Sequence, residues 1–439
     1  MSVEATAQAG VALTPKQARR AIIAATTGNM LEFYDFITFA YFAIQIGHTF
    51  FPVADPFVSL IASLATFGAG FLTRPIGAYV LGHYADKHGR KPSMLLSMML
   101  MGTGMLLLVV TPGYATIGIA APIIAVCARL VQGFALGGEV GSATSYLIES
   151  AAPEKRALTV SWQGASQNLA ATIGTLVGLV LALAMSEADL NAYGWRIALA
   201  LGALIVPFAL WIRSSLPETL HKPEEPDEVK DTGIRDYAKV LVLGFLMIGA
   251  GTISTYIFQY MATFGQNTLH FSTAISMTAA LGSNLVAVVA MLSGGWLADR
   301  VGRRKLMIWP QLLFALAVVP FFMWLTRSGT PVSFIAAVFV LAGLQSPQYA
   351  GVYASINESL PRAVRARAFA LVYSLPVTIL GGTTQPFVTW LLHVTGNPIS
   401  LAWYLTGVSL IGLIAMILMH ETSPRHKITP PQIGEPVPL

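Results

Sequence analysis

The sequence is poor in charged residues and contains a single cysteine. Charged residues make up 11% of the 439 residues and hydrophobic residues make up 55%, whereas soluble domains usually carry about 25% charged residues. Cys127 lies within an apolar run, so no disulfide framework can form within one chain. This composition excludes an ordinary soluble domain.

The signatures of several functional classes are also missing. The chain has no G-x-x-x-x-G-K-[ST] segment, which argues against a pump driven directly by ATP. No cluster of histidine and cysteine has the spacing of metal ligands, and no nucleophile is paired with a base. We therefore expect no metal, no cofactor and no enzymatic activity. The net charge of +5 comes from short basic clusters between apolar runs, which does not indicate nucleic-acid binding.

Long apolar runs recur along the chain and predict an all-α membrane protein. About 20 apolar residues cross the roughly 30 Å of hydrocarbon, and because several runs are longer we expect tilted or kinked helices. The first run is interrupted by Asn29, Glu32 and Asp35 and lacks a cleavage site, so it is interpreted as a span rather than a signal peptide. The twelve predicted spans cover residues 20–46, 57–83, 92–111, 117–148, 160–185, 195–213, 238–264, 271–297, 305–326, 331–357, 367–393 and 399–420.

One short motif occurs twice, 213 residues apart. Residues 82–91 and 295–304 both follow the pattern G-x-x-x-D-[KR]-x-G-R-[KR], after the second and the eighth predicted span. Two equivalent halves with a basic loop at the same place indicate an internally duplicated transporter. The fold class that we predict is therefore twelve transmembrane helices in two pseudo-symmetric six-helix bundles.

The basic residues predict the orientation of the chain. With twelve spans, both termini and the loops after the even-numbered spans lie on one side of the membrane. That side holds 22 of the 26 lysines and arginines, and such a bias assigns it to the cytoplasm. Residues 217–236 are polar and charged and are interpreted as a cytoplasmic linker. The predicted organisation is a cytoplasmic N-terminus (1–19), an N-terminal bundle (20–216), the linker (217–236), a C-terminal bundle (237–422) and a cytoplasmic tail (423–439).

The repeated motif is expected to act as a conformational gate. Asp86 and Asp299 can form charge networks with Arg90 and Arg303 that stabilise one arrangement of the two halves. Arg74 is assigned to the same gate, with a structural ion pair or a ligand contact as open alternatives. The alternative for the motif is a topological role alone, because basic loops also anchor the cytoplasmic side.

Three further segments carry a resemblance to a known family. Gly28–Phe36 (GNMLEFYDF), Arg74–Gly77 (RPIG) and Arg129–Glu139 (RLVQGFALGGE) stand with the duplicated motif. Together they resemble the metabolite:proton symporter family of the major facilitator superfamily, over residues 18–424. The resemblance implies secondary transport by alternating access in a bacterial inner membrane. Members of this family carry carboxylates, aromatic acids, proline or betaines.

Within the family, the chain is most similar to citrate and tricarballylate carriers. This narrower resemblance depends on Phe50–Pro52 (FFP), Phe67–Leu72 (FGAGFL) and Ser161–Gln167 (SWQGASQ). It implies proton-driven import of a citrate-like tricarboxylate. The alternatives are a symporter for another metabolite, such as a dicarboxylate, an aromatic acid, proline or betaine, and a sodium-coupled carboxylate carrier. A multidrug exporter is disfavoured, because a buried arginine does not suit an apolar cavity.

Acidic residues in the first and fourth spans are candidates for proton coupling. Glu32 and Asp35 are three positions apart and share a helix face, and each could take up and release a proton. The alternative is a structural ion pair with Arg74 or Arg129. Glu139 is a third candidate proton carrier or a structural partner.

Arg129 is the predicted anchor for an anion. It lies about twelve residues into the fourth span, near the middle of the membrane at about 1.5 Å per residue. A guanidinium can hold a carboxylate through two parallel hydrogen bonds. The alternative is a partner for Asp35 or Glu32 without substrate contact. Gln132 follows on the same helix face.

The C-terminal half offers neutral hydrogen-bonding groups. No charged residue occurs between Tyr256 and Trp296, so contacts there must come from hydroxyl and amide groups. Hydrogen bonds between helices are the alternative role for each such group. The complete set of candidate substrate contacts is Tyr34, Arg129, Gln132, Gln163, Gln167, Asn168, Tyr256, Tyr260, Gln345, Gln348 and Tyr349. The expected partners are a small carboxylate, protons or sodium, and the lipid bilayer, with the protein as a monomer.

Overall fold

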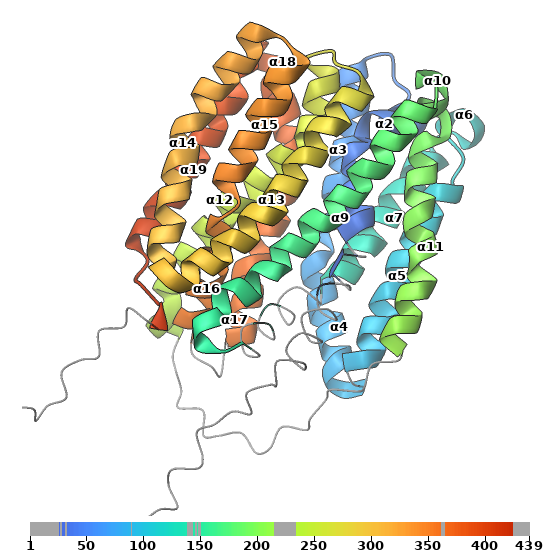
Figure 1. Cartoon of the computed structure of the whole chain (residues 1–439). Helices are drawn as coiled ribbons and strands as arrows, with labels where there is room; N and C mark the ends of the chain where they lie inside the picture. Colours follow the sequence, from blue (N-terminus) through green and yellow to red (C-terminus); the bar gives the residue numbers. More distant parts are fainter. Residues whose placement is uncertain are drawn as a thin grey trace, which may run out of the picture.

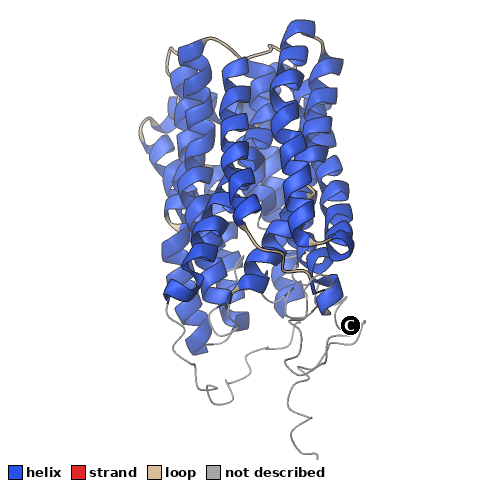
Figure 2. Cartoon of the chain, turned by 90° about the vertical axis from the view of Figure 1, so that its left-hand side faces the viewer, coloured by secondary structure: helices blue, strands red, loops and turns tan. Residues whose placement is uncertain are grey.

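The computed structural model describes residues 26, 29–30, 33–88, 90–137, 144, 147, 151–214, 234–360 and 365–424. Glu32, Glu139 and most of the predicted linker lie outside these residues, as do the side chains of Asp86 and Arg90. Every regular element within the described residues is helical (Figure 2).

The described part of each predicted span lies in one helix or in consecutive helices. Residues 33–41 are helical and lead into α2 (Ala43–Phe50). The rest of the N-terminal half comprises α3 (Pro56–Leu72), α4 (Arg74–His88), α5 (Arg90–Val110), α6 (Tyr114–Ile117), α7 (Ala120–Leu136), η1 (Pro153–Lys155), α9 (Arg156–Ala184), α10 (Glu187–Asp189), η2 (Leu190–Gly194) and α11 (Trp195–Ser214). The C-terminal half comprises α12 (Ile234–Asn267), α13 (Thr273–Val301), α14 (Arg303–Ser328), α15 (Pro331–Gln345), α16 (Gln348–Ser359), α17 (Arg365–Pro376), η3 (Val377–Gly381), α18 (Gly382–Thr395) and α19 (Ile399–Leu418).

Three predicted spans are interrupted where a proline removes a backbone donor. The second is divided at Thr73 into α3 and α4, just before Pro75. The tenth is divided around Pro347 into α15 and α16, and Pro376 precedes the π-helical turn η3 in the eleventh. Proline has no N–H to donate to the carbonyl four residues earlier, so a helix kinks or breaks there. The long spans predict kinked helices, and in these three spans the kink is explained by a proline.

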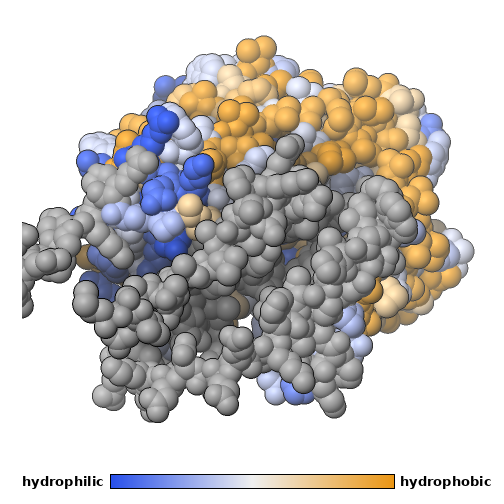
Figure 3. Space-filling view, turned by 60° about the horizontal axis from the view of Figure 1, so that its bottom comes forward, coloured by the Kyte–Doolittle hydropathy of each residue, from blue (hydrophilic) through white to orange (hydrophobic). Residues whose placement is uncertain are grey.

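The outer surface of the helices is apolar. Along α14, Trp309, Leu313 and Leu316 are 61%, 51% and 65% exposed. Among the described residues, seven helical segments are long and apolar enough to cross a membrane, and the apolar parts of α5 and α7 are shorter. In Figure 3, hydrophobic residues cover the side of the molecule and hydrophilic residues gather toward the end in front. We call this the basic end, defined by Arg300, Arg303 and Arg304 where α13 leads into α14.

The two halves meet along two pairs of helices. The helix α9 lies against α13, and α3 lies against α18 (Figure 1). Both contacts are close because glycines stand where the helices meet. A Cβ atom on Gly68 would lie 2.3 Å from the carbonyl oxygen of Gly382, and one on Gly295 would lie 2.8 Å from the Cα of Leu158. The interface between the halves therefore requires small residues at these positions.

Within the N-terminal half, Gly133 allows α7 to pack directly on α3. A Cβ atom there would lie 1.5 Å from the carbonyl oxygen of Gly70. We predict that Gly133→Ala lowers the free energy of unfolding by about 1–3 kcal/mol, because the two backbones must separate. Gly407→Ala is the matched control, since nothing lies within 4 Å of a Cβ atom at that position. The melting temperatures of the purified proteins in detergent measure the difference, and equal temperatures would contradict the packing argument.

Candidate functional site

A cavity of about 90 Å³ lies between the two halves. Since one water needs roughly 10–15 Å³ by this measure, the cavity has room for several waters or for a small solute. The helical residues 33–41 contribute Phe33 and Ile37 to its wall. The other wall residues come from α9, α12, α13, α15, α16, α17 and η3, so both halves enclose the same space.

Five of the predicted substrate contacts lie on the cavity wall: Gln167, Asn168, Tyr256, Gln345 and Tyr349. Gln167 and Asn168 come from α9 in the N-terminal half, and the other three come from the C-terminal half. The amide nitrogen Nε2 of Gln167 is buried and has no hydrogen-bond partner within the described residues. Amide groups of both halves therefore line the cavity.

The hydroxyl group of Tyr349 holds three segments of the C-terminal half together. It donates to the carbonyl oxygen of Gly251 (2.7 Å) and accepts from Nε2 of Gln345 (2.8 Å). Thr255 Oγ1 lies 2.8 Å away and, because the tyrosine proton is already used, acts as the second donor. All bonding capacity of this hydroxyl is satisfied, so α12, α15 and α16 present one fixed wall to the cavity.

The structure adds wall residues that the set of predicted contacts does not contain. They include Thr252, Thr255, Ser283 and Tyr373. Thr252 and Thr255 share a helix face with Tyr256 and Gln259, and this spacing in an uncharged span is a usable signal. Tyr373 stands among apolar residues of α17 without a polar neighbour on its face, and no comparable signal marks it.

Arg129, the predicted anion anchor, is fully buried in the N-terminal half and is not a cavity-wall residue. Its Nη1 donates to Oε1 of Gln132 at 2.6 Å and lies 3.7 Å from Oδ2 of Asp35. The guanidinium also lies over Phe36 and Phe39, 4.3 and 4.6 Å from the ring centres. Both carboxylate oxygens of Asp35 lack a hydrogen bond within the described residues. The ion pair is thus enclosed but loosely held.

The remaining predicted contacts form hydrogen bonds between helices. Tyr34 donates to the carbonyl of Ala198, and Gln163 exchanges hydrogen bonds with Asn29. Tyr260 accepts from Thr389, and Gln348 donates to Gln311. As substrate contacts these four residues, Arg129 and Gln132 stay predictions.

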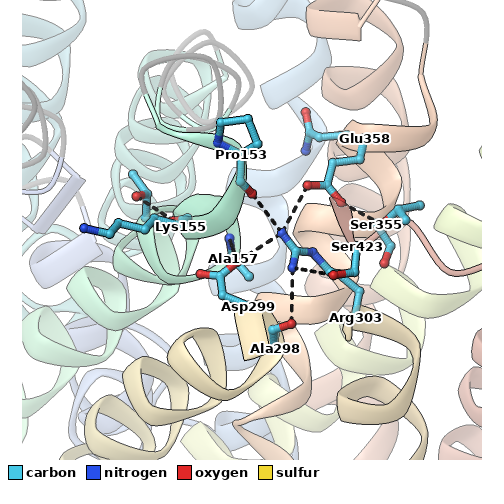
Figure 4. Close-up of polar contacts among 12 residues, drawn as sticks. Pro153, Lys155, Ala157, Ala298, Asp299, Arg303, Ser355, Glu358 and Ser423 are labelled. Atoms are coloured by element: carbon cyan, nitrogen blue, oxygen red, sulfur yellow. Dashed lines mark hydrogen bonds and ion pairs between the residues drawn. The ribbon is translucent and has the colours of Figure 1, made fainter. Parts of the chain in front are cut away.

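At the basic end, the second copy of the motif links the two halves through the helix backbone. Oδ1 and Oδ2 of Asp299 accept hydrogen bonds from the N–H groups of Ala157 (3.1 Å) and Leu158 (2.9 Å) (Figure 4). These are free donors of the first turn of α9, where a carboxylate also meets the positive end of the helix dipole. Asp299 on α13 therefore caps a helix of the other half.

Arg303 completes this network. Its buried Nη2 lies 3.0 Å from Asp299 Oδ1 and 3.3 Å from Glu358 Oε1. The same nitrogen donates to the carbonyl of Pro153, 3.3 Å away in the N-terminal half (Figure 4). Asp299 and Arg303 thus form the charge network expected of the motif, with backbone groups as their partners in the other half.

Other contacts join the halves beside the cavity and at the opposite end. Asn284 on the cavity wall donates to the hydroxyl of Tyr41 at 2.9 Å. Farther out, Gln45 Nε2 lies 3.4 Å from Gln266 Oε1, and the rings of Phe57 and His393 stack with centres 3.8 Å apart. Within the described residues, contacts between the halves therefore lie at both ends of the cavity.

Two helical bundles around a central cavity that has polar groups on its wall, with an apolar exterior, define a membrane transporter of the alternating-access type. The sequence profile of the Major Facilitator Superfamily matches residues 25–296 and 278–439. The D-xylose-proton symporter structure aligns with a TM-score of 0.72 at 18% identity, covering 92% of this chain and 98% of that chain.

The chain belongs to the Major Facilitator Superfamily, and the predicted fold of twelve helices in two bundles is confirmed. It is 35% identical to the citrate-proton symporter of Salmonella typhi, over 91% of this chain and 93% of that protein. It is 34% identical to the alpha-ketoglutarate permease of Escherichia coli (strain K12), over 95% and 98% of the two chains. These relatives are transporters, which fits the expectation that the chain is not an enzyme.

The cap on α9 predicts an effect of removing one charge. Asp299→Asn should lower the free energy of unfolding by about 2–3 kcal/mol, because Arg303 loses a buried partner and α9 loses its capping charge. Asp55→Asn is the matched control: Asp55 caps α3 in an exposed position of its own helix, and asparagine caps equally well. The comparison uses thermal unfolding in detergent. If both variants melt at the wild-type temperature, the contact across the halves contributes nothing measurable.

Proposed function

We propose that this chain imports an organic polycarboxylate, with citrate-like tricarboxylates first, in symport with protons. The observation that carries the proposal is the enclosed cavity between the bundles, lined by amide and hydroxyl groups and close to buried arginines. Similarity over nine tenths of a citrate-proton symporter supports the substrate class. The protein acts as a monomer in the bacterial inner membrane, with both termini in the cytoplasm.

The cavity wall supplies the neutral part of the binding site. Gln167, Asn168, Tyr256 and Gln345 offer hydrogen bonds to carboxylate and hydroxyl oxygens of the substrate. In a cavity removed from water, such bonds favour a polar substrate over an apolar one, because each buried polar group left unpaired costs about 1–3 kcal/mol. Tyr349, whose hydroxyl is already fully bonded, keeps this wall in place.

Transport occurs by rocking of the two bundles about the cavity. The basic end faces the cytoplasm, and Asp299 and Arg303 hold it closed while the opposite end opens. Breaking the contacts of Gln45 with Gln266 and of Phe57 with His393 exposes the cavity to the outside. Asp86 and Arg90, in the first copy of the motif, are proposed to act in the same gate.

The charge of the substrate demands a co-transported cation. Each elementary charge that crosses 100 mV is worth about 2.3 kcal/mol, so a trianion entering a negative cell alone is opposed by about 7 kcal/mol. Asp35 can carry one compensating proton. When it is protonated, its loose ion pair with Arg129 is broken and the arginine is released for another partner. Glu32 and Glu139 stay predictions as further proton carriers.

Ligand binding by the purified protein tests the substrate class. We expect citrate or tricarballylate to raise the melting temperature, because a ligand that binds only the folded state stabilises it by mass action. Proline and betaine should leave the temperature unchanged, with or without sodium. Stabilisation by proline or betaine, and not by any carboxylate, would contradict the proposal.

A dicarboxylate is the second candidate substrate. The specific observation in its favour is the 34% identity to an alpha-ketoglutarate permease over 95% of this chain. The same panel separates the two candidates, because a site for dicarboxylates binds alpha-ketoglutarate more tightly than citrate.

The role of Asp35 can be tested in proteoliposomes. We predict that Asp35→Asn abolishes accumulation driven by a pH gradient and retains exchange of substrate between equal pools, because exchange does not require the empty carrier to release a proton. Asp189→Asn makes the same chemical change at an exposed position on α10 and should behave as wild type. Full accumulation by Asp35→Asn would remove Asp35 as the proton carrier, and accumulation that follows a sodium gradient alone would contradict proton coupling.

A further inference from the structure

Arg74 is a buried cation for which the transport scheme above has no direct chemical task. It is the first residue of α4, immediately after the interruption of the second span, and is only 5% exposed. Thr73 fixes the interruption by donating from Oγ1 to the carbonyl of Leu130 on α7 at 2.6 Å. The kink therefore places the guanidinium inside the protein at a defined point of the fold.

Arg74 is not itself a cavity-wall residue, but aromatic rings connect its guanidinium to the wall. It lies 4.3 Å from the ring centre of Phe71 and 4.7 Å from that of Phe36. Phe71 in turn meets Tyr256 edge to face at 5.4 Å, and Tyr256 is a cavity-wall residue. Arg74 interacts with Tyr256 through its charge and a side-chain hydrogen bond, and through its charge with Tyr373, the wall residue on α17; Arg129 also interacts with Tyr256 through its charge. One arginine of the N-terminal half thus faces two tyrosines of the other half.

The hydrogen-bonding capacity of Arg74 is incompletely used. Its Nε and Nη2 atoms are buried and have no hydrogen-bond partner within the described residues. A buried donor without an acceptor is costly, and more so when it carries charge. The described part of the chain provides Arg74 with no carboxylate within ion-pair distance, whereas Arg129 has Asp35. An acceptor supplied by a ligand in the cavity would remove this cost.

We infer that Arg74 binds one carboxylate group of the substrate, with the hydroxyls of Tyr256 and Tyr373 as its neighbours at the cavity wall. The inference rests on the proposed function, since it assumes a carboxylate substrate. It assigns the two buried arginines different tasks. Arg74 contacts the substrate and sets the preference for anions, and Arg129 stays with Asp35 in the coupling pair, 0% exposed and packed on the rings of Phe36 and Phe67.

The contact also joins the halves through the ligand. Arg74 belongs to the N-terminal half, and both tyrosines belong to the C-terminal half. A carboxylate between them neutralises the arginine and accepts hydrogen bonds from both sides. Substrate binding would therefore favour closure of the bundles around the cavity, as alternating access requires.

The test measures the affinity of purified protein for tricarballylate and for its two monoamides, one amidated at a terminal and one at the central carboxyl group. We expect Arg74→Gln to bind tricarballylate roughly 100-fold more weakly than wild type, because a buried charge pair loses one partner. Arg74→Lys should recover only part of this loss, since an ammonium cannot form the bidentate contact. Arg327→Gln removes an exposed arginine near the end of α14 and should bind as wild type.

The monoamides separate a direct contact from a structural effect. Amidation of the carboxylate that Arg74 holds should weaken binding to wild type and leave binding to Arg74→Gln unchanged. If wild type and Arg74→Gln discriminate equally against both monoamides, Arg74 has no contact with the substrate and the inference is wrong. If Arg74→Gln does not fold, the same comparison is made with Arg74→Lys, in which the discrimination should shrink. If the wild type binds tricarballylate and Arg74→Gln binds it with the same affinity, this inference alone is wrong. If the wild type binds no polycarboxylate, the proposed function is wrong as well.

Discussion

The constraint on which this structure depends is that a polar group inside hydrocarbon must find its partner within the protein. A single bundle could meet this demand permanently, but a transporter must also break some contacts in every cycle. The chain separates the two kinds of contact. Tyr349 is satisfied entirely by Gly251, Thr255 and Gln345 within one half, so that half can move as a rigid body. The contacts that must break lie between the halves and include the hydrogen bond of Asn284 with Tyr41 and the cluster around Asp299 and Arg303.

Charge is distributed unequally over this framework. The membrane-embedded charges described near the cavity, Arg74, Arg129 and Asp35, all belong to the N-terminal half, and the facing wall is neutral. A neutral wall can be rigid because it needs no counter-ions. The N-terminal half, in contrast, holds its charges among aromatic rings such as Phe36, which tolerate a cation but do not fix it as a carboxylate would. The N-terminal half therefore provides the charged groups for substrate binding and proton coupling, and the C-terminal half provides a rigid neutral wall.

Much of this architecture could be predicted from the sequence. The apolar runs and the repeated motif determine the helices and the two halves, because hydropathy and duplication are local patterns. The position of a side chain around its helix relative to the other half is not local, and Arg129 illustrates the difference. An arginine in the middle of the fourth span was correctly predicted to be a buried charge. Whether Arg129 faces the cavity or Asp35 depends on how α7 packs. The backbone partners of Asp299 could not be predicted either, since any residue can supply an N–H group.

This last feature has an evolutionary consequence. A contact between the halves that is made by two side chains can be lost by substitution of either residue. The two positions must then change together to keep it. Asp299 instead holds the main-chain N–H groups of Ala157 and Leu158. This hydrogen bonding therefore needs no particular side-chain donor at the start of α9, and proline is barred there because it has no N–H to offer. The buried position of Ala157 limits its size for a separate reason, which is packing. Selection on this junction acts on a single acidic residue and on the helical state of the segment that it caps.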